Sequence, residues 1–172
     1  MRILSIETSC DDTGITIMEA KGGIQNTSFK ILANASNSQI KIHAQYGGVY
    51  PMLAKREHIK NLPILLEEVV RQGLTTKKDQ TLRIQKGSTF SLFEKSPVDA
   101  VAATYGPGLE PALWTGIVFA KELAEKWKIP LIPVNHMEGH ILSVFGKAKG
   151  KFTIPKIIPL YYLFSFLEDI PK

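Results

Sequence analysis

The stretch "RILSIETSCDDTGITIMEA", residues 2–20, decides the fold that this chain is expected to adopt. Residues 2–8 hold a short apolar run of the kind found in a buried strand. Residues 15–20 alternate apolar and polar side chains, as a half-buried strand does, and the "CDDTG" between the two segments has turn composition. The sequence therefore predicts an amino-terminal β-hairpin with an unusually acidic turn.

The rest of the chain is predicted to continue as strands and helices. A third strand is expected near residues 26–34, and a long amphipathic helix follows Pro51, which Pro63 should kink or split in two. The positions of that helix predicted to face the core are Leu53, Ile59, Leu62, Leu65, Leu66, Val69 and Val70. A buried strand at 98–106, a helix, the short strand "PLIPVN" and a last helix starting at "HMEGH" come next. Three meandering strands followed by strand–helix crossovers predict an α/β fold with a mixed sheet and helices on its faces.

Length and composition limit the classes of protein that remain. With 172 residues, 44% of them hydrophobic and 22% charged, the chain has the size of one globular domain or slightly more. No run of about 18 apolar residues is present, so a membrane span is not expected. Cys10 is the single cysteine, which excludes an internal disulfide and fits a cytoplasmic location. The net charge of +5 is compatible with binding a polyanion such as RNA.

The acidic turn is the first candidate site. It contains Glu7, Asp11 and Asp12, together with the hydroxyl groups of Thr8 and Ser9. Hydroxyls and backbone amides in such a turn can hold phosphate oxygens, while a carboxylate can hold a cation or position a nucleophile. The alternative is that Asp-Asp-Thr-Gly only makes a good turn, and the spacing alone leaves both interpretations open.

A glycine-rich loop is the second candidate site. Gly106-Pro107-Gly108 follows a predicted buried strand, at the carboxyl end where open α/β sheets bind ligands. Its backbone can approach a ligand closely at Gly106 and Gly108, although no Gly-Lys-Ser/Thr follows and the loop is not a P-loop. The alternative is a strand–helix connection whose glycines serve only its geometry.

Two histidines form the third candidate site. His136 and His140 are four residues apart, so on a helix both imidazoles can reach one cation, with zinc, iron and manganese all possible. Glu138 lies on another face of that helix and cannot serve as the general base of an H-E-x-x-H protease. The alternative is a pair of exposed histidines in the first turn of an ordinary helix. His43 and His58 have no partner at metal spacing and are expected on a helix surface or in a loop.

These elements, taken in order, resemble the amino-terminal half of the TsaD/Kae1 family. The resemblance covers roughly residues 1–72 and 97–145, and it is carried by "ILSIETSCDDTG", "YGGVYPMLAKREHIKNL", "GPGLEPALWTGIVFAKELAEKW" and "PLIPVNHMEGH". Members of this family transfer a threonylcarbamoyl group from threonylcarbamoyl-adenylate to N6 of adenosine 37 in tRNAs that read codons beginning with A. The resemblance implies the actin/Hsp70-like (ASKHA) fold, which consists of two RNase-H-like lobes with the ligand between them.

The resemblance also implies roles for individual residues. His136 and His140 match two metal-binding histidines of the family, with one iron or zinc ion bound. Asp11 and Asp12 match the acidic turn of the active site, although members usually carry Asp-Glu-Thr there, so Asp12 departs mildly from the pattern. The helical segment at about 51–73 matches the surface through which bacterial members pair with a related, non-catalytic TsaB-like protein.

The resemblance divides the chain into a first lobe at 1–145 and a short remainder. Within the lobe, an excursion at about 75–96 is longer than in many members. Residues 146–172 are expected to be a truncated or divergent start of the second lobe, without Ser-Gly-Gly-His-Thr and without the aspartate that is the family's third metal ligand. The alternatives to a transferase are a non-catalytic scaffold or partner subunit and, less consistent with the position of Glu138, a metalloprotease.

Overall fold

The predicted amino-terminal hairpin is present and belongs to a five-stranded sheet. The computed structural model describes residues 1–22, 28–73 and 96–143 of the chain. Strand β1 (Arg2–Glu7) pairs antiparallel with β2 (Asp12–Lys21), which in turn pairs antiparallel with β3 (Ser28–Ser38). Strand β4 (Ala100–Gly106) lies parallel to β1, and β5 (Leu131–Asn135) lies parallel to β4.

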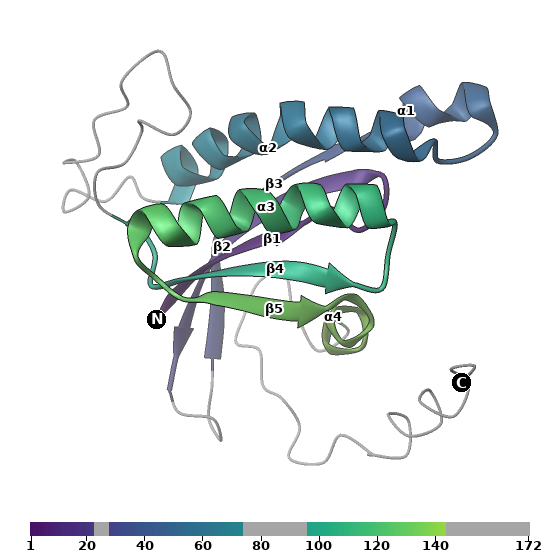
Figure 1. Cartoon of the computed structure of the whole chain (residues 1–172). Coiled ribbons are helices and arrows are strands. Elements are labelled where there is room, and N and C mark those ends of the chain that lie inside the picture. The colour runs from purple at the N-terminus through teal and green to yellow at the C-terminus, as the bar shows by residue number, and fades with distance from the viewer. Residues whose placement is uncertain (23–27, 74–95, 144–172) are drawn as a thin grey trace.

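The order of the strands confirms the predicted fold class. Across the sheet the order is β3-β2-β1-β4-β5, so β1 is the central strand (Figure 1). Helix α2 (Pro51–Gly73) lies between β3 and β4 in the chain, and helix α3 (Glu110–Trp127) connects β4 to β5. Three meandering antiparallel strands followed by parallel strands with helical crossovers make the mixed α/β sheet that the sequence predicts.

The hydrophobic core lies between the sheet and these two long helices. Helices α2 and α3 lie side by side on the same face of the sheet, where α2 packs on β2 and β3 and α3 packs mainly on β4 (Figure 1). The sheet contributes alternate residues of each strand, as the period of two requires, and the helices contribute residues at helical spacing. The largest members of this core are Leu4, Ile6, Ile15, Ile17, Leu62, Leu65, Leu66, Val69, Val101, Phe119, Leu123 and Trp127.

Three details differ from the sequence predictions. Strand β2 begins at Asp12 instead of residue 15, because its first residues already pair with β3, and the acidic turn is correspondingly shorter. Helix α2 continues through Pro63, so of the two predicted effects of this proline, a kink or a split, the split does not occur. The prediction that Ile59 faces the core is also wrong, since its side chain is 56% exposed and lies beside α3 instead of under α2.

Short elements complete the described part of the lobe. The helix α1 (Ile40–His43) and the 3₁₀ helix η1 (Ala44–Tyr46) join β3 to α2, and α4 (His136–Ser143) follows β5 directly. Most of the predicted excursion at 75–96 and the whole segment 146–172 lie outside the described residues. Within the described ranges, every helix is too short or too polar to cross a lipid bilayer.

Candidate functional site

The three candidate sites meet at one edge of the sheet. Because β1, β4 and β5 are parallel, their carboxyl ends lie at the same edge, and antiparallel β2 begins there. The acidic turn follows β1, the loop Gly106–Gly108 follows β4, and the histidine helix α4 follows β5. The topology thus gathers onto one edge the segments that the sequence singled out far apart in the chain.

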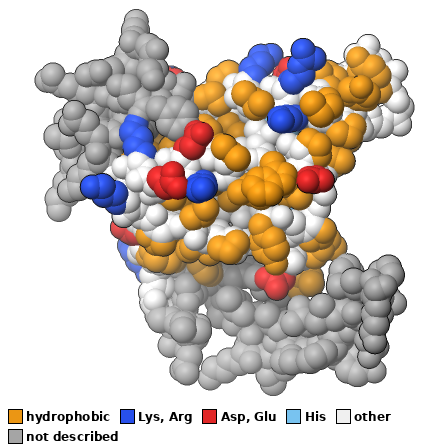
Figure 2. Space-filling view, viewed as in Figure 1, with side chains coloured by type: hydrophobic (Ala, Val, Ile, Leu, Met, Phe, Trp, Pro, Cys, Tyr) orange, Lys and Arg blue, Asp and Glu red, His pale blue; other side chains and the backbone are white. Residues whose placement is uncertain are grey.

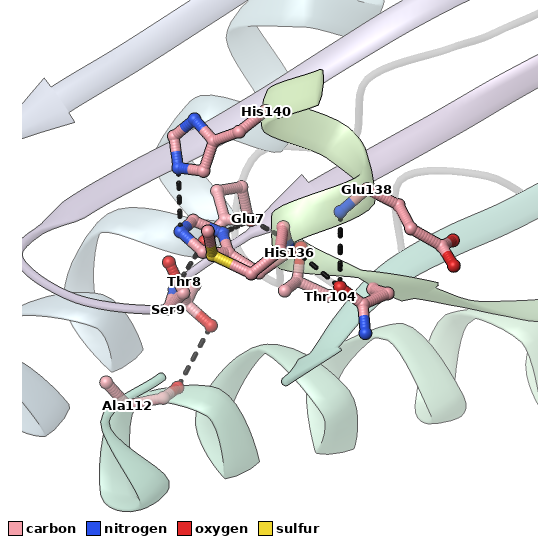
Figure 3. Close-up of polar contacts among 10 residues, drawn as sticks. Glu7, Thr8, Ser9, Thr104, Ala112, His136, Glu138 and His140 are labelled. Carbon is pink, nitrogen blue, oxygen red and sulfur yellow. Dashed lines mark hydrogen bonds and ion pairs between the residues drawn. The ribbon is translucent and has the colours of Figure 1, made fainter. Parts of the chain in front are cut away.

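Helix α4 presents the two histidines as a facing pair. Asn135 caps the helix, because its side-chain Oδ1 accepts hydrogen bonds from the backbone N–H groups of Met137 at 2.9 Å and Glu138 at 3.2 Å. The cap fixes His136 in the first turn, and His140 lies one turn later on the same face. The two Nε2 atoms approach to 2.9 Å, while the side chain of Glu138 points away from both rings (Figure 3).

The two rings present donor atoms of one kind toward each other. Two imidazole nitrogens bound tetrahedrally to a metal at about 2.1 Å lie about 3.4 Å apart, so the observed separation of 2.9 Å is somewhat shorter. Within the described ranges, no group of three His, Cys, Asp or Glu side chains converges as a metal site. The chain therefore supplies two facing donors of the type that iron and zinc accept, His136 and His140.

Glu7 connects the histidine pair to strands β1 and β4. Its carboxylate accepts hydrogen bonds from the Ser9 backbone N–H at 2.5 Å and from the Thr104 hydroxyl. Oε2 of Glu7 also lies 3.5 Å from Nδ1 of His136 (Figure 3). Burial raises the pKa of Glu7, but the hydrogen bonds from Ser9 and Thr104 and the nearby His136 outweigh it and lower the pKa below its ordinary value. Glu7 is therefore an ionised acceptor at neutral pH.

The acidic turn has an exposed side and a buried side. Asp12 is exposed and Asp11 is half-buried, so both carboxylates remain accessible. Thr8 and Ser9, in contrast, are buried, and the Thr8 hydroxyl donates to the Ala112 carbonyl of α3 at 2.9 Å. A direct contact of the Thr8 or Ser9 side chain with substrate stays a prediction, as do the catalytic roles of Asp11 and Asp12.

The thiol of Cys10, within the acidic turn, is exposed. Partial burial and the neighbouring Asp11 carboxylate raise the pKa of this thiol above its ordinary value. The thiol is therefore protonated at neutral pH and is not an activated nucleophile.

The glycine loop and helix α3 pack directly on the acidic turn. A Cβ atom on Gly108 would lie 2.7 Å from the Ser9 carbonyl oxygen, and one on Gly116 would lie 2.3 Å from the Thr8 hydroxyl oxygen. The Leu109 N–H donates to the same Ser9 carbonyl at 2.7 Å. These close approaches explain why glycine is needed at both positions, and Gly106 adds a backbone φ of +151°, which favours glycine. Ligand binding by Gly106 and Gly108 stays a prediction.

His58 lies behind the acidic turn, and its predicted place on a surface or in a loop is wrong. It is fully buried, and its Nε2 lies 3.1 Å from the Cys10 carbonyl oxygen. A carbonyl only accepts, so Nε2 carries the hydrogen and Nδ1 is the acceptor. That Nδ1 accepts from the Thr13 hydroxyl at 2.7 Å and from Nε2 of Gln39 at 3.3 Å. Burial lowers the pKa of His58 below its ordinary value, although the hydrogen bond to Cys10 and nearby carboxylates oppose the shift.

His43 continues this network and is likewise buried, contrary to the prediction for it. The Tyr50 backbone N–H donates to Nδ1 of His43 at 3.3 Å, so Nε2 carries the hydrogen and donates to Oε1 of Gln39 at 3.0 Å. The amide of Gln39 therefore accepts from one histidine and donates to the other. We call Thr13, Gln39, His43 and His58 the buried histidine network. It anchors the backbone of the acidic turn to α1 and α2.

Helices α2 and α3 leave an apolar groove on the surface opposite the sheet. Figure 2 shows hydrophobic side chains spread over this face of the molecule. The groove encloses a cavity of about 430 Å³, and we call it the α2–α3 groove. Its lining residues are Lys55, Ile59, Leu62, Pro63, Trp114, Thr115, Val118, Phe119 and Glu122. Trp114 is 56% exposed there.

Comparison with known proteins gives one family and several similar folds. A family model described as TsaD, tRNA N6-adenosine threonylcarbamoyltransferase, matches residues 30–82 and 89–161, which is more than half of the chain. YeaZ from Pseudomonas aeruginosa is 17% identical, with a TM-score of 0.44 over 78% of this chain and 43% of that one. The Thermus thermophilus RuvC structure is 12% identical, with a TM-score of 0.44 over 87% of this chain and 71% of that one. The chain thus spans less than half the length of YeaZ.

Proposed function

Because the chain belongs to the TsaD family of tRNA N6-adenosine threonylcarbamoyltransferases, we propose that it supplies the first lobe for transfer of a threonylcarbamoyl group to N6 of adenosine 37 in tRNA. The observation that carries the proposal is the facing pair of Nε2 atoms, 2.9 Å apart, of His136 and His140. The pair lies at the sheet edge that also carries the acidic turn and the glycine loop, and the net charge of +5 suits a tRNA substrate.

The proposed reaction is an acyl-type transfer. The exocyclic amine of adenine attacks the carbamoyl carbon of threonylcarbamoyl-adenylate, the bond from that carbon to the phosphate oxygen breaks, and AMP leaves with the electron pair. The amine must lose one proton, and the half-buried Asp11 carboxylate is the proposed acceptor. Asp12, exposed beside it, is proposed to position the adenine or the donor.

His136 and His140 are proposed to hold one iron or zinc ion. Such an ion, when bound, would act as a Lewis acid toward oxygens of the donor and orient it. The backbone at Gly106 and Gly108, together with the Thr8–Ser9 corner, is proposed to form the wall against which the adenylate lies. The TsaD family pattern places a third metal ligand beyond the part that this chain resembles, which is why the chain is proposed as one lobe of the site.

The metal proposal is tested on the purified chain by metal analysis. The double variant His136→Ala, His140→Ala is expected to lose the iron or zinc that copurifies with the wild-type chain. Glu138→Ala is the matched control, because this carboxylate lies in the same helix but points away from both imidazoles (Figure 3). Unchanged metal content in the double variant would refute the site.

The chemical proposal is tested by assaying tRNA modification. The chain is incubated with unmodified tRNA and threonylcarbamoyl-adenylate, and the modified nucleoside is measured by mass spectrometry. Asp11→Ala is expected to lower the rate by 10²-fold or more, roughly the size of a lost general base, whereas Glu125→Ala on the exposed side of α3 leaves it unchanged. A wild-type rate in Asp11→Ala contradicts the proton-acceptor role.

The α2–α3 groove is proposed as the docking surface for a TsaB-like partner. Ile59, Trp114 and Val118 expose apolar surface there, while Lys55 and Glu122 supply charges at the same groove. This arrangement, an apolar centre with charged groups beside it, is typical of a protein–protein interface. If the chain binds the partner and metal but transfers nothing, the alternative of a non-catalytic scaffold is favoured.

A further inference from the structure

Two hydrogen bonds and one nearby imidazole nitrogen, from three separate segments, converge on the Glu7 carboxylate. The Ser9 N–H, in the acidic turn, reaches Oε1 at 2.5 Å, and the Thr104 hydroxyl, on β4, reaches Oε2. Nδ1 of His136, on α4, lies 3.5 Å from the same Oε2. Glu7 is not one of the predicted metal ligands. Its carboxylate lies on the side of the His136 ring that faces away from His140.

The direction of these contacts limits the chemistry of His136. A carboxylate only accepts hydrogen bonds, so whenever the imidazole is in its neutral form the nitrogen that faces Glu7 is favoured as its N–H. A neutral imidazole carries one hydrogen, which leaves Nε2 with a free lone pair, and Nε2 is the atom that faces His140 at 2.9 Å. We propose that Glu7 is a positioning residue that holds His136 in the Nδ1–H tautomer, so that Nε2 is free to bind the metal.

This proposal rests on the proposed metal site, but it makes a separate claim. Metal-binding histidines often donate their second ring N–H to a carboxylate, which fixes both the tautomer and the orientation of the ring. Here the carboxylate is itself held by two further donors, so it has little freedom to turn away from His136. The side chains of Glu7 and His136 are 40% and 26% exposed, so the contact lies near solvent. The bonds from Ser9 and Thr104 hold the carboxylate in place.

The sharpest substitution is Glu7→Gln, which keeps the size of the side chain. Glutamine has one oxygen, which can accept hydrogen bonds, and one amide NH₂ group, which can only donate them. If the oxygen keeps the Ser9 N–H, the NH₂ group faces Thr104 and His136. The Thr104 hydroxyl can accept by rotating, but His136 can accept only at a deprotonated Nδ1, which moves its hydrogen to Nε2. Nε2 of His136, the proposed metal-binding atom, then carries the hydrogen and has no free lone pair for the metal.

The test has two readouts on the full chain. In ¹⁵N-edited NMR of the metal-free protein, with His136 assigned by its loss in His136→Asn, wild-type His136 is expected as the Nδ1–H tautomer and Glu7→Gln as the Nε2–H tautomer. Zinc titration is expected to show an affinity about 10- to 100-fold lower in Glu7→Gln. Thr104→Val is the control, since it removes a hydrogen bond from the same carboxylate but leaves the tautomer unchanged.

Two results would overturn the proposal: an Nε2–H tautomer for His136 in the wild-type chain, or zinc affinity within about threefold of wild type in Glu7→Gln. The wild-type tautomer is decisive even if Glu7→Gln fails to fold. Failure of the proposed metal site gives a different result from failure of the Glu7 proposal. If the metal site is wrong, wild-type protein and the His136→Ala, His140→Ala variant bind zinc equally, while the tautomer of His136 still tests the role of Glu7.

Discussion

Replacing His58 by leucine tests whether the buried histidine network stabilises the lobe. His58, Thr13 and Gln39 are all fully buried. In His58→Leu the Thr13 hydroxyl loses its acceptor at 2.7 Å, the Gln39 amide loses one at 3.3 Å, and the Cys10 carbonyl loses a donor at 3.1 Å. Each buried polar group left without a partner costs about 1–3 kcal/mol. We expect the free energy of unfolding to fall by roughly 2–5 kcal/mol, since Gln39 keeps a weak alternative acceptor.

The effect should depend on pH in a defined direction. Burial lowers the pKa of His58 in the folded protein below the ordinary value of 6.5. As the pH falls below about 6.5, the unfolded chain binds a proton that the folded chain does not, so folded wild type loses stability. The contribution is therefore present above pH 6.5 and lost below it, at up to about 1.4 kcal/mol per pH unit. His58→Leu lacks this group, so the difference between the two proteins should shrink toward pH 5.

Urea unfolding, followed by tryptophan fluorescence and circular dichroism from pH 8 to pH 5, measures both effects. A milder variant, Thr13→Val, removes one hydrogen bond to His58 and should cost about 1 kcal/mol. Thr16→Val is its matched control, because Thr16 lies in the same strand and donates to Asn34 across the exposed side of the sheet. It should change stability by less than about 0.5 kcal/mol. A difference between wild type and His58→Leu that stays constant with pH would refute the neutral, buried His58 described above.

Three further predictions concern the acidic turn and the groove. Gly116→Ala places a Cβ 2.3 Å from the Thr8 hydroxyl oxygen and should lower the free energy of unfolding by about 1–3 kcal/mol. Gly139→Ala, with open space at its Cβ, should be neutral or slightly stabilising. Urea titration measures both. The raised pKa of Cys10 should make iodoacetamide alkylation slower at pH 7 than that of a free model thiol, with the rate rising only at alkaline pH; faster alkylation at pH 7 would contradict it. Trp114→Glu should abolish co-elution with a TsaB-like partner in size-exclusion chromatography while leaving the melting temperature nearly unchanged, and co-elution at wild-type level would rule out the α2–α3 groove as the interface.

Local pattern was sufficient to predict the framework of this lobe. The apolar run at 2–8, the alternation at 15–20, the helical spacing after Pro51 and the two later strands predicted the element order and fold class that the structure confirms. These signals succeed because each is repeated over many neighbouring residues. Pro63 does not end α2, which packs on β2 and β3 and remains one helix from Pro51 to Gly73.

The polar interior was not predictable in the same way. His43 and His58 were expected at the surface because neither has a patterned partner in sequence, yet Gln39 joins them once β3, α1 and α2 are packed together. Glu7 was grouped with the acidic turn, but its carboxylate faces back toward Thr104 and His136. Gln39 and His43 are 4 positions apart, but Gln39 and His58 are 19 apart and Glu7 and Thr104 are 97 apart, so the tertiary structure brings the latter pairs together.

Backbone carbonyls of the acidic turn accept hydrogen bonds from three neighbouring segments. The Cys10 carbonyl accepts from His58, the Asp11 carbonyl accepts from the Gln39 N–H at 3.0 Å, and the Ser9 carbonyl accepts from the Leu109 N–H at 2.7 Å. These three bonds come from α2, from the residue before α1 and from the residue before α3, so the main chain is held from several sides. These bonds position the backbone at Asp11, whose side chain is the proposed proton acceptor.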